Sequence, residues 1–220
     1  MLVVEKQNIV QKDFDSVDFV PALYNKTYYS SVMQDEAALI DWQSGPLDKF
    51  LRRYLLLRGM KSFPWMFDAG CGPAVHHLFS LAKYNNMFHL ADFMPENIAE
   101  IQKWVSNQSD AHNWDVFVRV ILSSEGIIPT TRAIAGRERE VRKKISSYSN
   151  LDLKRRVVPK FRNSAPLVAS YFVADSATRS KNVFARMTRN AFEIVADDGV
   201  FISAYLGNCS RYLVGRKWLP

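Results

Sequence analysis

The chain has 220 residues, of which 48% are hydrophobic, and it carries a formal net charge of +7. This length and composition fit one globular domain with a substantial core. No apolar run approaches the roughly 20 residues needed to cross a bilayer, and the N-terminus lacks the apolar region of a secretory signal. Cys71 and Cys209 stand far apart and in no metal-ligand spacing. We therefore expect a cytoplasmic protein with free thiols, no metal site and no membrane partner.

Much of the positive charge lies between residues 132 and 162, where arginines and lysines are interleaved with Glu138 and Glu140. A basic stripe can bind phosphate backbones. No recognisable nucleic-acid-binding module surrounds this one, however. We favour the interpretation as the solvated face of a helix and expect no nucleic-acid partner.

In chain order, residues 1–60 are predicted to form an N-terminal cap segment with helices, and residues 61–220 the core of what is a single domain overall. Residues 1–29 are expected to be irregular and are rich in aromatic side chains. Residues 35–57 have a helical pattern, broken near residues 44–46 by Ser-Gly-Pro.

Beyond residue 60, short apolar runs alternate with amphipathic stretches. The predicted strands are residues 64–69, 88–92, 116–122, 167–173 and 199–205. The predicted helices are residues 74–84, 95–106, 137–148 and 180–196. This alternation predicts an α/β fold, with a Rossmann-like, mostly parallel sheet and helices on both faces. The carboxyl ends of its strands then meet along one edge, where ligands bind.

A glycine pair follows the first predicted strand, in the sequence DAGCGP at residues 68–73. Glycines at a strand-to-helix turn let the backbone approach a ligand closely, with helix N–H groups facing its negative charge. Val75 stands where a dinucleotide-binding fingerprint has its third glycine, so the turn suits a methionine-type carboxylate better than a pyrophosphate. The alternative is a tight turn that needs glycine only for its backbone.

An acid ends the second predicted strand. Asp92 lies 20 residues beyond Gly72, which is the usual spacing to the carboxylate that accepts hydrogen bonds from ribose hydroxyls. The alternative is a helix cap or a surface acid. Together with the glycine turn, the position of Asp92 favours the ribose-binding role.

These motifs make the chain resemble the family of class I S-adenosylmethionine (SAM)-dependent methyltransferases that contains nicotinamide N-methyltransferase, phenylethanolamine N-methyltransferase and the amine and thioether methyltransferases. The similarity runs from about Phe14 to the C-terminus. Besides the glycine turn it includes Asp92-Phe93 followed by Asn97, Lys103-Trp104, Asn113-Trp114, Glu125-Gly126, residues 137–142 and residues 151–153.

The resemblance implies a SAM-binding site and methyl transfer to an amine, pyridine nitrogen or thioether of a small molecule, with S-adenosylhomocysteine as product. By this resemblance, the basic stretch is a charged helix that leads into a strand. Asp152 then lies on the adenine side of the ligand and Leu153 packs on the base. The alternative is that both residues belong to an ordinary loop after a helix. The predicted cofactor-binding residues are Tyr24, Asp68, Gly70, Cys71, Gly72, His76, Asp92, Phe93, Asn97, Asp152 and Leu153. The candidate catalytic residues, near the reacting end, are Phe19, Tyr171 and His76.

The sequence departs from its relatives in four places. His76 stands where they have a tyrosine that helps to hold the SAM carboxylate, and a neutral histidine is a weaker hydrogen-bond donor there. Ala74 replaces a threonine, so a possible donor is lost at that position. Ala204 lies in a stretch of the fifth predicted strand where they carry an acid, for which Asp175 is a candidate substitute or else a loop acid. The relatives also continue where this sequence stops, at Pro220.

The stop at Pro220 has two interpretations: the sequence is a fragment, or the chain has a shortened C-terminus that lacks part of the acceptor pocket. In the second case the fifth strand is a sheet edge that needs cover from a partner or from the N-terminal segment.

Methyl transfer from a sulfonium needs mainly proximity, orientation and desolvation, and no strong general base stands out. In sequence, His76, His77, His89 and His112 show no pattern of a base with an orienting partner. A second hypothesis is a SAM cyclase that binds SAM alone and forms azetidine-2-carboxylate and methylthioadenosine. A third is a non-catalytic SAM-binding protein. We expect a monomer or a homodimer.

Overall fold

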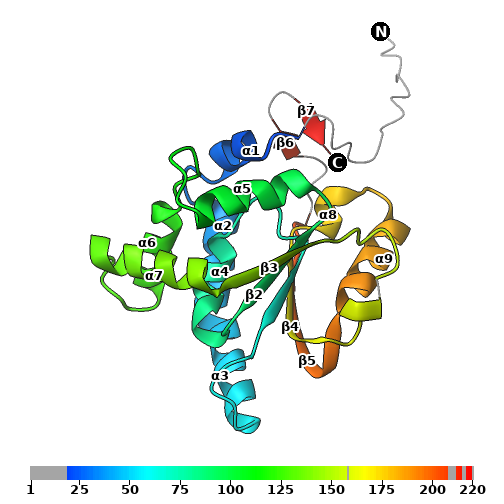
Figure 1. Ribbon diagram of the computed structural model, residues 1–220, viewed down its shortest axis with the longest axis horizontal. Helices are drawn as coiled ribbons and strands as arrows, with labels where there is room; N and C mark the ends of the chain where they lie inside the picture. The colour runs from blue at the N-terminus through cyan, green and yellow to red at the C-terminus, as the bar shows by residue number, and fades with distance from the viewer. Residues whose placement is uncertain (1–18, 158, 208–211, 215–216, 220) are drawn as a thin grey trace, which may run out of the picture.

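The computed structural model of the protein describes residues 19–157, 159–207, 212–214 and 217–219. Its centre is a sheet of five parallel strands in the order β3-β2-β1-β4-β5 (Figure 1). The strands are β1 (Met66–Ala69), β2 (Phe88–Asp92), β3 (Ile145–Asn150), β4 (Ala165–Tyr171) and β5 (Val195–Ala204). A separate antiparallel hairpin consists of β6 (Tyr212–Val214) and β7 (Lys217–Leu219). The strand order reverses between β1 and β4, and ligands bind at such a switch point.

Helices cover both faces of this sheet, as predicted for a Rossmann-like α/β fold. Successive strand residues point to opposite faces: Met66 belongs to one hydrophobic cluster and Phe67 to another. The first cluster holds residues of α2 (Gln34–Trp42), η2 (Gln43–Leu47), α3 (Asp48–Leu57), α4 (His76–Leu81), η3 (Ala82–Tyr84), α5 (Pro95–Val105), α6 (Asp115–Ser124) and α7 (Thr131–Lys144). The second holds residues of α8 (Ala174–Ala177) and α9 (Lys181–Phe192), with η4 (Pro159–Phe161) against it.

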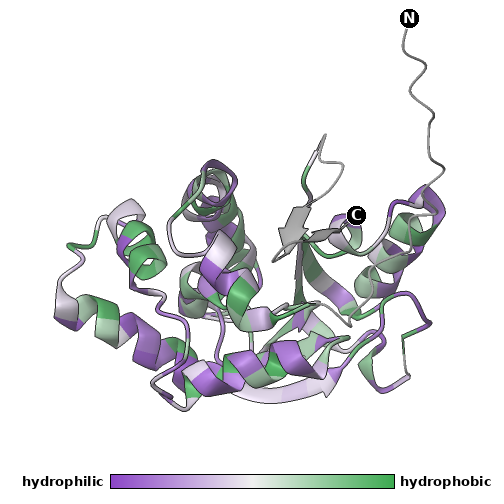
Figure 2. Ribbon diagram, turned by 90° about the horizontal axis from the view of Figure 1, so that it is seen from above, coloured by the Kyte–Doolittle hydropathy of each residue, from purple (hydrophilic) through white to green (hydrophobic). Residues whose placement is uncertain are grey.

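Helices α3, α5, α6, α7 and α9 are amphipathic, whereas all the residues of α4 are buried. Figure 2 shows hydrophilic and hydrophobic residues together on them, as expected when one side of a helix rests on the sheet and the other faces solvent. Helix α1 (Pro21–Tyr28) lies above the carboxyl edge of the sheet (Figure 1). None of the described helices is long and apolar enough to cross a membrane.

The predicted strand at residues 116–122 is wrong, because these residues lie in helix α6. The run is rich in valine and isoleucine and therefore resembles a buried strand. In the structure Phe117 and Ile121 are buried one helical turn apart, while Arg119 between them is exposed. Burial on one side of a helix explains the apolar content without a strand.

The predicted helix at residues 137–148 begins earlier and ends sooner. Helix α7 follows Thr130, whose hydroxyl accepts a hydrogen bond from the N–H of Ala133 at 3.2 Å. It ends at Lys144, and the next six residues form β3, which is the third strand of the sheet. Strand β3 is an edge strand with three serines, so it lacks the apolar alternation by which strands are recognised.

The N-terminal part is more helical than expected. Helix α1 occupies the end of the segment predicted to be irregular, whose residues 1–18 lie outside the described residues. The break expected near residues 44–46 is instead a π-helical turn that joins α2 to α3. Pro46 has no N–H to donate, and a wider turn accommodates the missing hydrogen bond. The division into a cap and a core at residue 60 stays a prediction.

Candidate functional site

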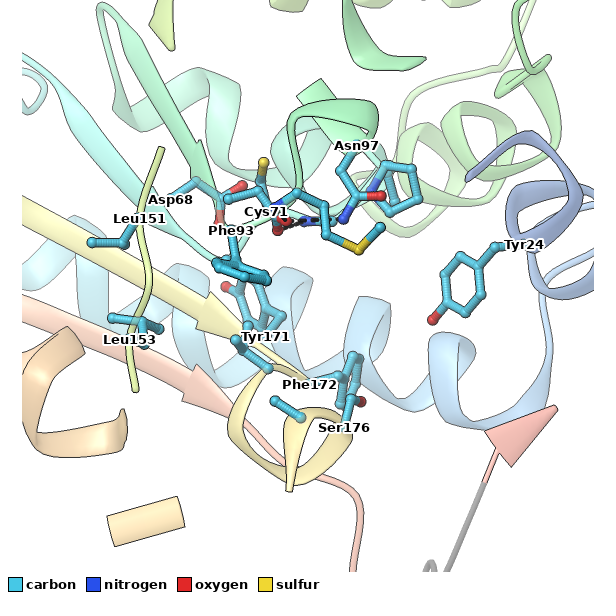
Figure 3. A pocket seen from close by; sticks show the side chains of 18 of the residues that line it. Tyr24, Asp68, Cys71, Phe93, Asn97, Leu151, Leu153, Tyr171, Phe172 and Ser176 are labelled. Carbon is cyan, nitrogen blue, oxygen red and sulfur yellow. Dashed lines mark hydrogen bonds between the residues drawn. The ribbon is translucent and has the colours of Figure 1, made fainter. Parts of the chain in front are cut away.

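A pocket of about 290 Å³ opens at the carboxyl edge of the sheet, between the ends of β1, β2 and β4. In Figure 3, Tyr24 enters from α1 on one side, and Leu151 and Leu153 lie on the opposite side, after β3. All thirteen residues predicted to bind the cofactor or to lie near the reacting end line this pocket. The structure thus brings them together; their roles in binding and catalysis stay predictions.

The glycine turn forms the floor next to β1. Gly70 and Gly72 have positive φ angles of 85° and 59°, which glycine adopts far more readily than other residues. A Cβ atom on Gly70 would lie 2.5 Å from a methyl carbon of Val173, whereas nothing lies within 4 Å of a Cβ placed on Gly72. Gly70 is therefore required both by its backbone and by close packing against the segment that follows β4.

Asp92, at the end of β2, is fixed by three donors. One carboxylate oxygen accepts from the backbone N–H of Gly72 at 2.8 Å, and the other accepts from the backbone N–H of Met94 and from the side-chain amide of Asn97, both at 2.9 Å. Burial raises the pKa of Asp92; the three donors oppose this shift and nearby Asp68 adds to it, and the net pKa lies above its usual range. Asn97 therefore helps to orient the Asp92 carboxylate.

Two neighbouring histidines at the start of α4 are each paired with a buried carboxylate. His77 Nε2 lies 2.6 Å from an oxygen of Asp68, and His76 Nε2 lies 2.8 Å from an oxygen of Glu36 in α2. The structure thus gives both histidines a carboxylate neighbour that no sequence pattern revealed. Sequence reasoning missed Glu36 because it stands 40 residues before His76, on an element whose packing the pattern did not reveal.

Aromatic side chains enclose the end of the pocket below α1. The ring of Phe19 packs on Tyr24 with centroids 5.2 Å apart, Tyr24 packs on Tyr29 at 5.7 Å, and Tyr29 packs on His76 at 4.6 Å. Burial raises the pKa of Tyr24 to about 12, so its hydroxyl stays neutral. On the β4 side, Phe172 has a φ of 56°, a strained conformation for an aromatic residue of the kind that collects at functional sites.

Tyr171 is anchored from behind by Gln43. The amide of Gln43 donates to the Tyr171 hydroxyl at 3.2 Å, and both side chains are buried. Tyr171→Phe removes this acceptor and leaves the amide unsatisfied, so we expect a loss of about 1–3 kcal/mol in the free energy of unfolding. Urea denaturation measures the change. Tyr148→Phe is the control, because Tyr148 is half-buried but its hydroxyl makes no hydrogen bond within the described residues; an equal loss in both variants would contradict the prediction.

The loop after β3 forms the opposite wall. Leu151 and Leu153 are buried, and Asn190 of α9 donates to the carbonyl of Leu153 at 2.8 Å. Asp152 lines the pocket and also shapes the loop, since its carboxylate accepts from the N–H of Lys154 at 2.9 Å. The loop is therefore held by α9 and by a hydrogen bond of its own, and Asp152 and Leu153 line the pocket.

A model of the NNMT/PNMT/TEMT family matches residues 6–220. The chain belongs to this family. It is 26% identical to the indolethylamine N-methyltransferase of Mus musculus over 117 residues, covering 50% of this chain and 40% of that protein. It is 23% identical to the nicotinamide N-methyltransferase of Homo sapiens over 175 residues, covering 77% and 63%. These matches thus span less than two thirds of the length of either relative.

Among solved structures, a SAM-bound amino pentose methyltransferase from Micromonospora echinaspora is similar, with 14% identity, a TM-score of 0.46 and coverage of 87% of this chain and 59% of that one. The family match confirms the resemblance inferred from the glycine turn, Asp92 and the downstream motifs. The relatives named here are N-methyltransferases, which gives no support to the cyclase alternative.

The acid proposed to replace the one missing at Ala204 does not line the pocket of this NNMT/PNMT/TEMT family member. A carboxylate oxygen of Asp175 accepts from the backbone N–H of Leu206 at 2.8 Å, and burial raises the pKa of this carboxyl. Its neighbours Ser176 and Ala177 do line the pocket. Of the two alternatives left open for Asp175, its place outside the pocket lining favours the loop acid.

Several basic side chains of helix α7 make contacts with other parts of the protein. Arg137 pairs with Glu125 at 2.6 Å, Arg142 lies over the ring of Trp104 at 4.1 Å, and Lys144 donates to the carbonyl of Ala82 at 2.6 Å. These contacts tie α7 to η3, α5 and the turn after α6, so these three cations have a structural role.

Proposed function

We propose that this protein binds SAM in the pocket at the carboxyl edge of the sheet and transfers its methyl group to an amine, pyridine nitrogen or thioether of a small molecule. The observation that carries the proposal is the fixed carboxylate of Asp92 beside the glycine turn at the switch point, in a chain of the NNMT/PNMT/TEMT family. A carboxylate in this position accepts hydrogen bonds from ribose hydroxyls.

The residues of the pocket fit such a ligand. Within the described residues, His76 Nδ1 and Asn97 Oδ1 are buried and lack hydrogen-bond partners, and buried polar atoms without partners are rare unless a ligand or water completes them. The apolar wall at Leu151 and Leu153 suits a flat base, and the positive φ angles of Gly70 and Gly72 keep side chains away from the floor.

SAM supplies an activated methyl group on a sulfonium, so the protein has to orient the reacting groups, desolvate them and exclude water. Asp92 holds the ribose of the nucleoside half, and the glycine turn holds the methionine half. The aromatic faces of Phe19, Tyr24 and Tyr29 stabilise a cation and cover the reacting end. Tyr171, held by Gln43, limits the space beneath it.

We expect purified protein to convert SAM to S-adenosylhomocysteine only when an acceptor is added. The experiment incubates the protein with SAM alone and with amines, pyridines and thioethers in turn, and mass spectrometry quantifies the nucleoside products. Methylthioadenosine in the sample without acceptor would instead support the cyclase alternative. Calorimetric binding of SAM with no turnover of any acceptor would support a non-catalytic SAM-binding protein.

A further inference from the structure

Helix α1 carries one buried side chain, and that side chain is polar. Asn25 is the only buried residue among residues 21–28 and is 0% exposed. Its side-chain amide donates to the backbone carbonyl of Pro73 at 3.0 Å, although the two residues lie 48 positions apart in the sequence. Pro73 directly follows the glycine turn and lines the pocket. The hydrogen bond therefore joins α1 to the turn that forms the floor of the pocket.

Two elements hold this turn from different sides. The N–H of Gly72 donates to Asp92, at the end of β2, at 2.8 Å. The carbonyl of the next residue, Pro73, accepts from Asn25 of α1. The residue before Asn25 is Tyr24, whose side chain enters the pocket from α1 (Figure 3). The contact between Asn25 and Pro73 thus helps to fix where the Tyr24 ring lies relative to the glycine turn.

Helix α1 depends on tertiary contacts to keep its place. It has eight residues and begins without a hydrogen bond from a capping side chain, and a helix of this length is marginal on its own. It contacts α5 and β6, but all its residues other than Asn25 are exposed or half-buried. The buried hydrogen bond of Asn25 is therefore a specific attachment of a helix that has little apolar burial.

This attachment has a cost in stability. Asn25 Oδ1 is buried and makes no hydrogen bond within the part of the chain that the structure describes. Leaving a buried acceptor unsatisfied is unfavourable, whereas replacing a polar group by an apolar one of the same shape can be nearly neutral. The net contribution of Asn25 to the free energy of unfolding is therefore small, while its contribution to the position of α1 is specific.

Resting on the proposed function, we infer that Asn25 is a positioning residue that fastens α1 to the glycine turn and thereby slows the release of bound SAM. Asn25 does not line the pocket; it acts through Tyr24 and through Phe19, whose ring packs on Tyr24. Weakening the attachment of this aromatic cover should raise the dissociation rate of SAM more than it changes the association rate. Because coupling between two sites is reciprocal, bound SAM should in turn stabilise α1.

The first test measures both rates of SAM binding by surface plasmon resonance in the wild type and in Asn25→Leu. Leucine has a similar branched shape but no donor, so we expect the dissociation rate to rise roughly three- to tenfold, which is the effect of one hydrogen bond. The association rate should stay nearly unchanged. Asn25→Ala removes the same donor with a smaller side chain and should give the same increase.

Asn85→Leu is the matched control. Asn85 is 1% exposed, and its amide also donates to a backbone carbonyl, that of Leu81, at 2.9 Å. Its Oδ1 is likewise buried without a partner among the described residues, and Asn85 lies outside the pocket lining. This variant should leave both rates of SAM binding unchanged. Urea denaturation of the two leucine variants separates an effect on SAM release from a loss of stability.

A second readout needs neither SAM nor activity. The N–H of Tyr29 donates to the carbonyl of Asn25 at 2.8 Å, so amide hydrogen exchange at Tyr29 and within α1 reports how firmly this helix is held. We expect faster exchange there in Asn25→Leu than in the wild type, with exchange in α4 and β1 unchanged. Added SAM should slow the exchange of α1 in the wild type.

An unchanged dissociation rate of SAM in both Asn25→Leu and Asn25→Ala would overturn this inference while leaving the proposed function intact. Equal hydrogen exchange of α1 in the wild type and Asn25→Leu would overturn it as well. A wild type that does not bind SAM would overturn the proposed function and the inferred effect on SAM release with it. The exchange measured without SAM distinguishes these outcomes, because it tests the attachment of α1 directly.

Discussion

Gly70→Ala is expected to cost about 2–5 kcal/mol of unfolding free energy and to reduce SAM binding. Part of this cost, about 1–2 kcal/mol, comes from the left-handed backbone that a residue with a Cβ adopts unfavourably, since Gly70 has a φ of 85°. The remainder, about 1–3 kcal/mol, is overpacking, because the new Cβ would lie 2.5 and 2.7 Å from the two methyl carbons of Val173.

The measurement is urea denaturation of Gly70→Ala, with Gly72→Ala as the matched control. Gly72 has a φ of 59°, and nothing lies within 4 Å of the position that a Cβ on it would take, so only the backbone cost of about 1–2 kcal/mol should appear. Adding Val173→Ala to Gly70→Ala removes the two methyl carbons and should recover part of the loss, which a double-mutant cycle isolates. Equal losses for Gly70→Ala and Gly72→Ala would show that Val173 moves aside freely.

The places of the glycine turn and Asp92 in the fold could be predicted from the sequence, because they depend on local motifs. The glycine turn and Asp92 each directly follow or end a strand with a clear apolar pattern, and β2 has the predicted bounds. Parallel strand topology then brings these ends to one edge. No contact between distant elements has to be known to place them.

The other half of the site depends on packing between elements that lie far apart in the sequence. Glu36 reaches His76 only because α2 and α4 bring the two side chains together, and Gln43 reaches Tyr171 from the π-helical turn. Neither spacing forms a motif. The same reason explains the error at residues 116–122, where periodicity alone does not separate a buried strand from a helix that covers a sheet.

Asp92→Ala is expected to weaken SAM binding roughly 100-fold, as two hydrogen bonds from ribose hydroxyls to a charged acceptor are lost at roughly 1.5 kcal/mol or more each. The variant also leaves the N–H groups of Gly72 and Met94 and the amide of Asn97 without their acceptor. Thermal unfolding must therefore accompany the calorimetry, so that a loss of affinity is measured on folded protein.

Two further variants serve as controls for Asp92→Ala. Asn97→Ala keeps the carboxylate and removes one of its three donors, so it should weaken SAM binding by about tenfold or less. Asp110→Asn changes an exposed acid that pairs with Lys103 at 3.0 Å and should leave SAM affinity unchanged. Equal affinity in the wild type and Asp92→Ala would remove the basis of the site assignment.

The pH dependence of SAM binding gives an independent check on Asp92. A protonated carboxyl is a poorer acceptor than a carboxylate, so affinity should decrease as pH falls through the pKa of Asp92. Burial raises that pKa, and although the three donors lower it, it stays above its usual range; the decrease should therefore begin at a higher pH than an ordinary aspartate would give. Asp92→Asn has no titratable group at this position and should abolish the decrease, which calorimetry of SAM binding at falling pH measures; an equal decrease in that variant would contradict the prediction.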